Sequence, residues 1–364
     1  MSDLILSRRE LQVLTNCIYS SDRRYVQVSY PFYDLELFTL DMQKPELTHI
    51  IRPDDFDRAR LQRKPTERGV SADELPSYSD FKDCLLSSNF LDYRNEGEIA
   101  SKLVELKEES MDPNRRPRPV FVAVDTNILY FKFLSRHLPM KDEASGKVVD
   151  GNDFRYVLSE IVQLEIDSRI VHKYSRDEIS ALASLFAHKE LIGELKNGSS
   201  RRGRIAKLAF NEMNYLMTEL RALRIKGTPT KGKERNDIEI AQSYKYWARN
   251  ADYDVFLLTA DEDMVSHALA SELMTMQLEL PYDVPSHGRI DPWAVTDLLY
   301  DLAVTFGVIS LDNEGTHLFG EWAGKTSTDY SRENLKAVLT SSEKHTSISR
   351  QLDVCRKILS QHLE

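Results

Sequence analysis

The stretch "VFVAVDTNILYF", residues 120–131, decides the fold of the central part of this sequence. Its first five residues are apolar, which is typical of a short buried β-strand. The strand ends in a carboxylate, Asp125, and apolar residues resume directly after Asn127. A buried charge is costly unless it is paired or bound to a metal ion. We therefore expect Asp125 to have a partner supplied by the rest of the chain.

Strand-like and helical patterns alternate after this stretch. Further strands are predicted in "DVFLLTADEDM" (254–264) and "MTMQLEL" (274–280). Helices are predicted from about Asn127, over 154–170, 176–196 and 203–225, and from Asn236. Such alternation indicates an α/β fold, in which helices flank both faces of a parallel β-sheet.

The flanking regions have a different character. The segment "MDPNRRPRP" (111–119), with three prolines and three arginines, is typical of a domain boundary. Residues 1–118 are expected to form a separate α+β region, and residues 119–290 the central domain. Residues 291–364 are expected to form a helix, a hairpin turning at Asn313–Gly315 and a further helix.

The composition is that of a globular protein, with 41% hydrophobic and 29% charged residues among 364. No apolar run approaches the roughly 18 residues of a membrane span, and the first residues do not resemble a signal peptide. Cys17, Cys84 and Cys355 lie far apart, which excludes a disulfide framework and a cysteine-rich zinc site. We expect a cytoplasmic protein that does not bind membranes.

Positive charge is concentrated in one part of an acidic chain. The net charge is −10, whereas residues 196–235 contain eleven Lys and Arg and three Glu, a local charge of +8. Such a zone can contact phosphates, although "KNGSSRRGR" and "KGTPTKGKER" can equally be solvated loops. The candidates for phosphate contacts are Arg201, Arg202, Arg204, Lys231, Lys233 and Arg235.

Carboxylates occur at related places in the predicted elements. Asp125 and Asp261 each follow a predicted strand, with Asp263 two residues further on. The carboxyl ends of parallel strands meet at one edge of a sheet, so we expect these acids to lie together. Glu165 falls on a helical face with Leu158, Ile161, Val162, Ile166 and Arg169, and Asp237 opens a face with Ile240, Ala241 and Tyr244.

Each acid also has a simpler explanation. Asp237 can cap its helix, as can Asp261 or Asp263, and Glu165 can pair with an arginine. Four such acids in one α/β domain are better explained by one shared cation. Oxygen ligands without cysteine or clustered histidine favour Mg²⁺ or Mn²⁺ over zinc.

The order of "AVDTNIL", "IVQLEI", "NDIEIA" and "LLTADEDM" resembles the PIN domain family of metal-dependent nucleases, over about residues 119–281. The match falls on Asp125, Glu165, Asp237 and Asp261, with Asp263 as an additional acid. Glu160 is an alternative candidate for the position assigned to Glu165, but the spacing from Val162 to Glu165 is the one found in the family. The basic insert, from about His172 to Arg235, is longer than in minimal members of the family.

The resemblance implies an endoribonuclease that hydrolyses phosphodiester bonds at a Mg²⁺ or Mn²⁺ site. Asp125, Asp237 and Asp261 would bind metal, Glu165 would bind metal or orient water, and Asp263 would be a weaker or second-metal ligand. Asn127 and Thr259 would position these carboxylates by hydrogen bonds.

Three alternatives remain at this stage. The first is a nuclease directed at DNA or at a structured nucleic acid, and the second is a non-enzymatic scaffold that acts in a protein or nucleic-acid complex. A phosphotransfer domain of the haloacid-dehalogenase type is the third, but it would require an acid in place of Asn127. The sequence identifies neither a protein partner, such as an antitoxin, nor an oligomeric state.

Overall fold

The computed structural model describes residues 2–19, 24–63, 71–112, 114, 118–227, 233–311 and 315–361. The chain divides into two compact units, each built from segments that are far apart in the sequence. Unit 1 contains Met1–Phe90, His172–Ile205 and Asp283–Glu364, and unit 2 contains Leu91–Val171 and Ala206–Tyr282. The three regions expected from the sequence were consecutive, whereas these two units interleave along the chain.

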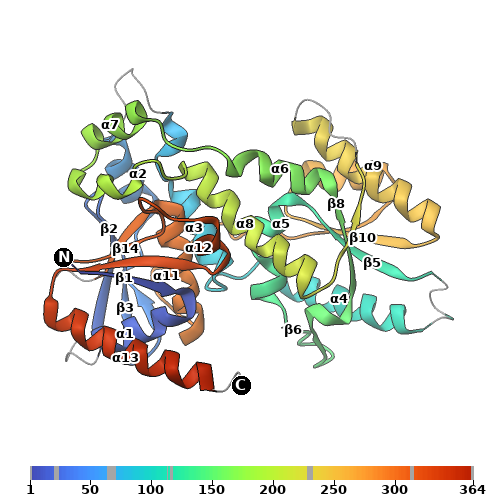
Figure 1. The fold of residues 1–364 in the computed structure, drawn as a ribbon. Coiled ribbons are helices and arrows are strands. Elements are labelled where there is room, and N and C mark those ends of the chain that lie inside the picture. The colour runs from blue at the N-terminus through green and yellow to red at the C-terminus, as the bar shows by residue number, and fades with distance from the viewer. Residues whose placement is uncertain are drawn as a thin grey trace. The chain divides into compact units, whose positions relative to one another are not determined.

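Unit 2 is organised around a sheet in which every neighbouring pair of strands is parallel (Figure 1). In spatial order the strands are β11 (Met274–Gln277), β10 (Asp254–Thr259), β5 (Val120–Val124), β8 (Arg155–Ser159) and β9 (Leu223–Ile225). The central strand β5 is buried along its whole length, as its apolar residues predict. The predicted parallel α/β sheet flanked by helices is therefore confirmed.

The order of these strands reverses beside β5. From β5 the chain proceeds outward through β8 to β9, and it then returns to the opposite side of β5 with β10 and β11. In open parallel sheets, ligands bind at the carboxyl ends of the strands where the order reverses. Here that place lies between β5 and β10, and Val124 is level with Leu258 across it.

Unit 2 also contains helices, a short hairpin and two short helical turns. The helices are α4 (Glu96–Met111), α5 (Thr126–Tyr130), α6 (Glu160–Ile170), α9 (Lys233–Ala251), α10 (Glu262–Ala270) and the part of α8 (Arg201–Thr218) that follows residue 205. The hairpin joins β6 (Met140–Lys141) to β7 (Val148–Val149), and unit 2 also contains a single π-helical turn, η3 (Phe133–His137), and a 3₁₀ turn, η4 (Gly151–Asp153).

Three predicted helices differ in extent in the structure. The helix predicted over 176–196 ends at Leu185, and a separate 3₁₀ turn covers Lys189–Leu195. The helix predicted over 154–170 is in fact the strand β8 followed directly by α6, with Ser159 capping α6 through the backbone N–H of Ile161. Leu158 therefore lies in the strand and not on the helical face of Glu165. The helix predicted over 203–225 likewise ends at Thr218 and is followed by β9.

Unit 1 contains an antiparallel sheet formed by both ends of the chain. In spatial order its strands are β1 (Ser2–Ser7), β15 (Asn334–Leu339), β14 (Thr316–Phe319), β13 (Val308–Leu311), β2 (Tyr25–Tyr30), β3 (Leu35–Asp41), β4 (Glu46–Thr48) and β12 (Gly288–Arg289). Because β1 pairs with β15 and β2 pairs with β13, the N-terminal and C-terminal regions share one sheet.

The helix α11 (Pro292–Phe306) forms much of the core of unit 1. Proline occupies its first turn, Asp291 accepts a hydrogen bond from the backbone N–H of Trp293, and the helix ends at Gly307, which has a φ of 87°. The other helical elements are η1 (Arg8–Glu10), α1 (Leu11–Tyr19), α2 (Pro53–Leu61), η2 (Ala72–Glu74), α3 (Tyr78–Ser87), α7 (Arg176–Leu185), η5 (Lys189–Leu195), α12 (Ser327–Ser331) and α13 (Ser342–Gln361).

The C-terminal predictions are confirmed in part. The predicted hairpin is present as the antiparallel pair β13 and β14, although residues 312–314 of its turn lie outside the described residues. The tail after Ser331 is not wholly helical, because β15 precedes α13. In the described part of the chain, no helix has the length and apolar character that crossing a membrane requires.

Candidate functional site

Asp125 lies at the carboxyl end of β5 and begins α5. Its backbone N–H donates to the carbonyl of Leu258 over 3.1 Å, which continues the pairing of β5 with β10 by one residue. Its carboxylate accepts the backbone N–H of Thr126 at 2.6 Å and so caps α5. The Asp125 side chain is only 4% exposed. The sequence therefore placed this carboxylate correctly at the buried end of a strand.

The second oxygen of Asp125 is held by two polar side chains. Asn127 Nδ2 donates to it over 2.6 Å and Thr259 Oγ1 donates over 2.9 Å. Asn127 is itself oriented because its Oδ1 accepts the backbone N–H of Ala260 at 2.9 Å. The hydrogen bonds expected from Asn127 and Thr259 are thus present, and they connect the ends of β5 and β10.

Glu165 approaches the same place from α6. Its Oε2 accepts the hydroxyl of Thr126 at 2.6 Å, and its Oε1 accepts the side-chain amide of Asn236 at 3.2 Å. These two partners are uncharged, and among the side chains that the structure describes no arginine pairs with Glu165. Thr126 and Asn236 adjoin predicted acids in the sequence, but nothing in the pattern assigned them a contact with Glu165.

Asp237 lies on α9 and is 9% exposed. It is the fifth residue of the helix, which begins at Lys233, so it is not the capping residue. The apolar face predicted beside it is confirmed, because Ile240, Ala241 and Tyr244 are completely buried. Tyr244 also fixes the helix against the sheet, since its hydroxyl donates to the carbonyl of Val124 at 2.8 Å and accepts the N–H of Ser159 at 3.1 Å.

The electrostatic environment links three of the acids. The pKa of Asp125 is raised from 3.8 to about 7, and burial is the largest cause; the hydrogen bonds from Thr259 and Thr126 lower the pKa, and the negative charges of Asp237 and Glu165 raise it. Asp237 and Glu165 are therefore near enough to Asp125 for charge repulsion. A cation placed among these carboxylates would stabilise their ionised forms.

Asp261 and Asp263 are more accessible to water. Asp261 is half-buried and caps α10 by accepting the backbone N–H of Asp263 at 2.9 Å, which confirms the capping explanation for this residue. Its own N–H donates to Thr259 Oγ1 at 3.0 Å, so it is joined to the hydrogen-bond network around Asp125. Asp263 is exposed on the first turn of the same helix.

The residues of this site match a hard divalent cation in chemical type. Their side-chain donors are carboxylate, amide and hydroxyl oxygens, which Mg²⁺ and Mn²⁺ prefer. Asn236 Oδ1 is buried and has no hydrogen-bond partner among the described residues, while the contact of its Nδ2 with Glu165 fixes the orientation of the amide. That oxygen can accept a metal-bound water. In the described ranges, no three His, Cys, Asp or Glu side chains are grouped closely enough to hold an ion by themselves.

The predicted basic residues lie in several environments. Arg204 is 2% exposed, and its guanidinium donates to the carbonyls of Val304, Ser199 and Thr305 within unit 1. A substrate phosphate cannot reach it without breaking this network, so the prediction for Arg204 is corrected to a structural role. Its positive charge in the sequence did not reveal that the side chain is buried.

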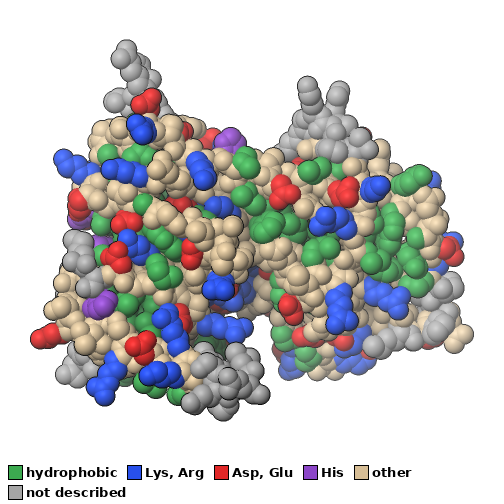
Figure 2. All heavy atoms as spheres, in the orientation of Figure 1, with side chains coloured by type: hydrophobic (Ala, Val, Ile, Leu, Met, Phe, Trp, Pro, Cys, Tyr) green, Lys and Arg blue, Asp and Glu red, His purple; other side chains and the backbone are tan. Residues whose placement is uncertain are grey.

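The other basic candidates divide between paired and undescribed side chains. Arg201 is bonded to Asp80 and is 13% exposed at its side chain, and Arg202 pairs with Asp73 at the surface of unit 1. Over the face of unit 1 shown in Figure 2, basic and acidic side chains are interspersed. Lys231 lies outside the described residues, and Lys233 and Arg235 are described only by their backbone in α9.

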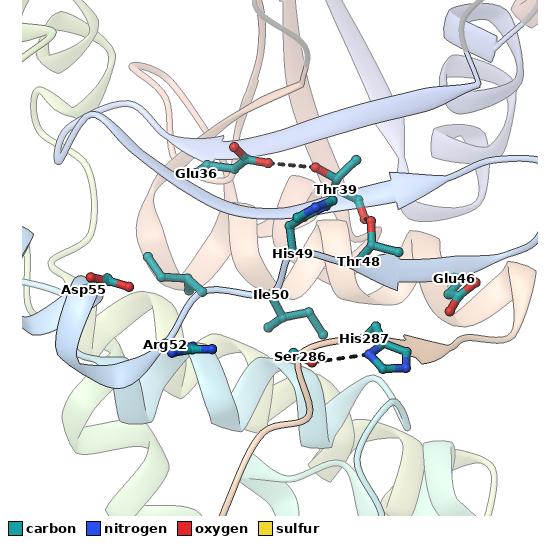
Figure 3. A pocket seen from close by; sticks show the side chains of 11 residues that line it. Glu36, Thr39, Glu46, Thr48, His49, Ile50, Arg52, Asp55, Ser286 and His287 are labelled. Atoms are coloured by element: carbon teal, nitrogen blue, oxygen red, sulfur yellow. Dashed lines mark hydrogen bonds between the residues drawn. The ribbon is translucent and has the colours of Figure 1, made fainter.

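An open groove in unit 1, of about 920 Å³, contains none of the predicted site residues (Figure 3). It lies beside β3 and β4, and it is lined in part by His49, His287 and Glu36. Glu36 is already bonded to Gln27 and to Thr39. Because most of its polar lining residues are exposed or already paired, Asp125 and the acids near it in unit 2 are the better candidate site.

Comparison with protein-family models and with curated protein sequences gave no match to this chain.

Proposed function

We propose that unit 2 is a metal-dependent nuclease and that its substrate is RNA, cleaved internally. The observation that carries the proposal is the position of Asp125. It is buried at the point where the strand order reverses, it is held by Asn127 and Thr259, and its pKa is raised in part by two further acids. The resemblance of the sequence motifs to the PIN domain family supports the same assignment.

Asp125, Asp237 and Asp261 would hold Mg²⁺ or Mn²⁺, with Asp263 at the exposed rim. When bound, such an ion lowers the pKa of a coordinated water and stabilises the negative charge of the phosphate. Asp125 is fixed in one orientation by Thr126, Asn127 and Thr259, so little reorganisation is required of it when substrate binds.

Glu165 and Asn236 would act on the attacking water. The Glu165 carboxylate is oriented by Thr126 and by the Asn236 amide, and it can accept a proton from a water molecule beside it. The unpaired Oδ1 of Asn236 can accept a second hydrogen bond from such a water. These two residues would therefore orient the nucleophile.

The proposal is tested by offering purified protein three labelled substrates side by side: single-stranded RNA, structured RNA and DNA. With Mg²⁺ or Mn²⁺ we expect internal cleavage of single-stranded RNA that a chelator abolishes. Cleavage of DNA but of neither RNA would indicate that the protein is a DNA nuclease. Binding of metal without cleavage of any substrate would favour a non-enzymatic scaffold.

A further inference from the structure

A site that contains several carboxylates needs a compensating positive charge to bind a phosphodiester chain. Asp125, Glu165 and Asp237 all repel a polyanion, and a metal ion offsets only the charge at the scissile phosphate. Arg169 is an exposed cation on the same helix as Glu165, four residues after it. It therefore lies one helical turn from an acid of the site.

Arg169 is oriented by Tyr130, and no acid among the described residues is bonded to it. Its Nη1 donates to the hydroxyl of Tyr130 over 3.0 Å, and its guanidinium carbon lies 5.6 Å from the centroid of the Tyr130 ring. Tyr130 is the last residue of α5, the helix that Asp125 caps. The arginine and tyrosine therefore join the two helices that carry Asp125 and Glu165.

The positive charge of Arg169 remains available to an anionic ligand. Glu165 is at the spacing that favours an ion pair with it, but both Glu165 oxygens accept from Thr126 and Asn236. Within the part of the chain that the structure describes, no carboxylate lies within ion-pair distance of Arg169. A guanidinium has five N–H donors, and the contact with Tyr130 uses one of them.

We propose that Arg169, positioned by Tyr130, binds the backbone phosphate of a nucleotide adjacent to the one cleaved at the acid site. This inference rests on the proposed nuclease function and extends it to a substrate-binding residue. The ligand class is a single-stranded nucleic acid, whose phosphate oxygens match the planar donors of arginine. Tyr130 is a positioning residue, because it acts through the arginine.

The test measures binding and cleavage of one fluorescein-labelled single-stranded RNA. Binding is followed by fluorescence anisotropy in EDTA across a salt series, and cleavage by initial rates with Mn²⁺. The variants are Arg169→Gln, Arg169→Lys and Tyr130→Phe. Arg118→Gln is the matched control, because it removes the same charge from a residue before β5, at the opposite edge of the sheet.

We expect Arg169→Gln to weaken binding about tenfold to a hundredfold, in line with the loss of a charged hydrogen bond. Its slope of log affinity against log salt should fall by about 0.7, the value for one phosphate contact to a single strand. KM should rise with the loss of affinity while kcat changes little. Arg169→Lys should keep the slope but lose affinity, and Tyr130→Phe should raise KM several-fold without changing the slope.

Two results would overturn the inference, and they are distinguishable. If the wild-type protein binds and cleaves RNA but Arg169→Gln behaves like Arg118→Gln, the contact between Arg169 and Tyr130 only joins α5 to α6. If the wild-type protein neither binds nor cleaves RNA, the proposed function fails and the inference fails with it.

Discussion

Replacing Asp125 with asparagine removes a buried charge from the candidate site and should alter how stability depends on pH. In the folded, metal-free protein the pKa of Asp125 is raised from 3.8 to about 7. The folded state therefore retains a proton between about pH 4 and pH 7 that the unfolded chain releases. Raising the pH through this range lowers the stability of the wild-type protein, because the unfolded state gains from ionisation and the folded state does not.

The magnitude follows from the size of the shift. A rise from 3.8 to about 7 corresponds to at most about 4 kcal/mol, since each pKa unit is worth about 1.36 kcal/mol. Asparagine cannot ionise, so the variant lacks this loss of stability. It presents one oxygen in place of the two that accept from Thr126, Asn127 and Thr259. The imperfect match should cost about 1–3 kcal/mol at every pH.

The assay is urea unfolding in EDTA at pH 4, 6 and 8 for wild type and Asp125→Asn. At pH 4 the variant should be less stable by about 1–3 kcal/mol. Between pH 4 and pH 8 the free energy of unfolding of the variant, relative to that of wild type, should rise by up to about 4 kcal/mol. Asp252→Asn is the control, because Asp252 is an exposed carboxylate of unit 2 with a side chain 78% accessible. A stability difference for Asp125→Asn that is independent of pH, or that moves the other way, would refute the reasoning.

Three further predictions follow from other contacts. Calorimetry should detect Mn²⁺ binding to wild type that the double variant Asp125→Asn and Asp261→Asn abolishes, and unchanged binding in that variant would contradict the site. Arg204→Gln should lower the free energy of unfolding by about 3–5 kcal/mol, because it breaks a buried charged network. Replacing the exposed Arg202 with glutamine should change this free energy by less than about 1 kcal/mol. Equal effects of the two substitutions in urea unfolding would contradict the structural role of Arg204. Tyr244→Phe should cost about 1–3 kcal/mol, because it removes the hydrogen bonds to Val124 and Ser159, and a thermal melt equal to that of wild type would show that these bonds are dispensable.

The sequence predicts the centre of unit 2 well because β5 and β10 carry strong local signals. Each is a continuous apolar run that ends in polar residues, and the carboxyl ends of neighbouring parallel strands necessarily meet. The apolar runs and their polar ends are therefore sufficient to bring Asp125, Asn127 and Thr259 together. They do not predict the contacts of Thr126 and Asn236 with Glu165, because short polar residues beside a motif carry no signal of their own.

Other features of the structure could not be predicted from the sequence, for physical reasons. The strand β8 passes into α6 without a turn, and its residues Tyr156, Val157 and Leu158 are all buried, so their apolar pattern fits a helix as well as a strand. Pairing of β1 with β15 connects residues more than 300 positions apart, and no local pattern encodes such a contact. Arg204 was assigned by its charge, which does not distinguish a buried arginine from an exposed one.

The central proposal is that Asp125, Glu165, Asp237 and Asp261 together perform phosphodiester hydrolysis. The most direct measurement is Mn²⁺-dependent cleavage of labelled single-stranded RNA by wild type, Asp125→Asn and Asp237→Asn, with binding measured in parallel. We predict that each variant loses cleavage while it binds RNA as well as wild type or more tightly, because each removes negative charge near the phosphates. Cleavage by either variant at the wild-type rate would contradict the claim.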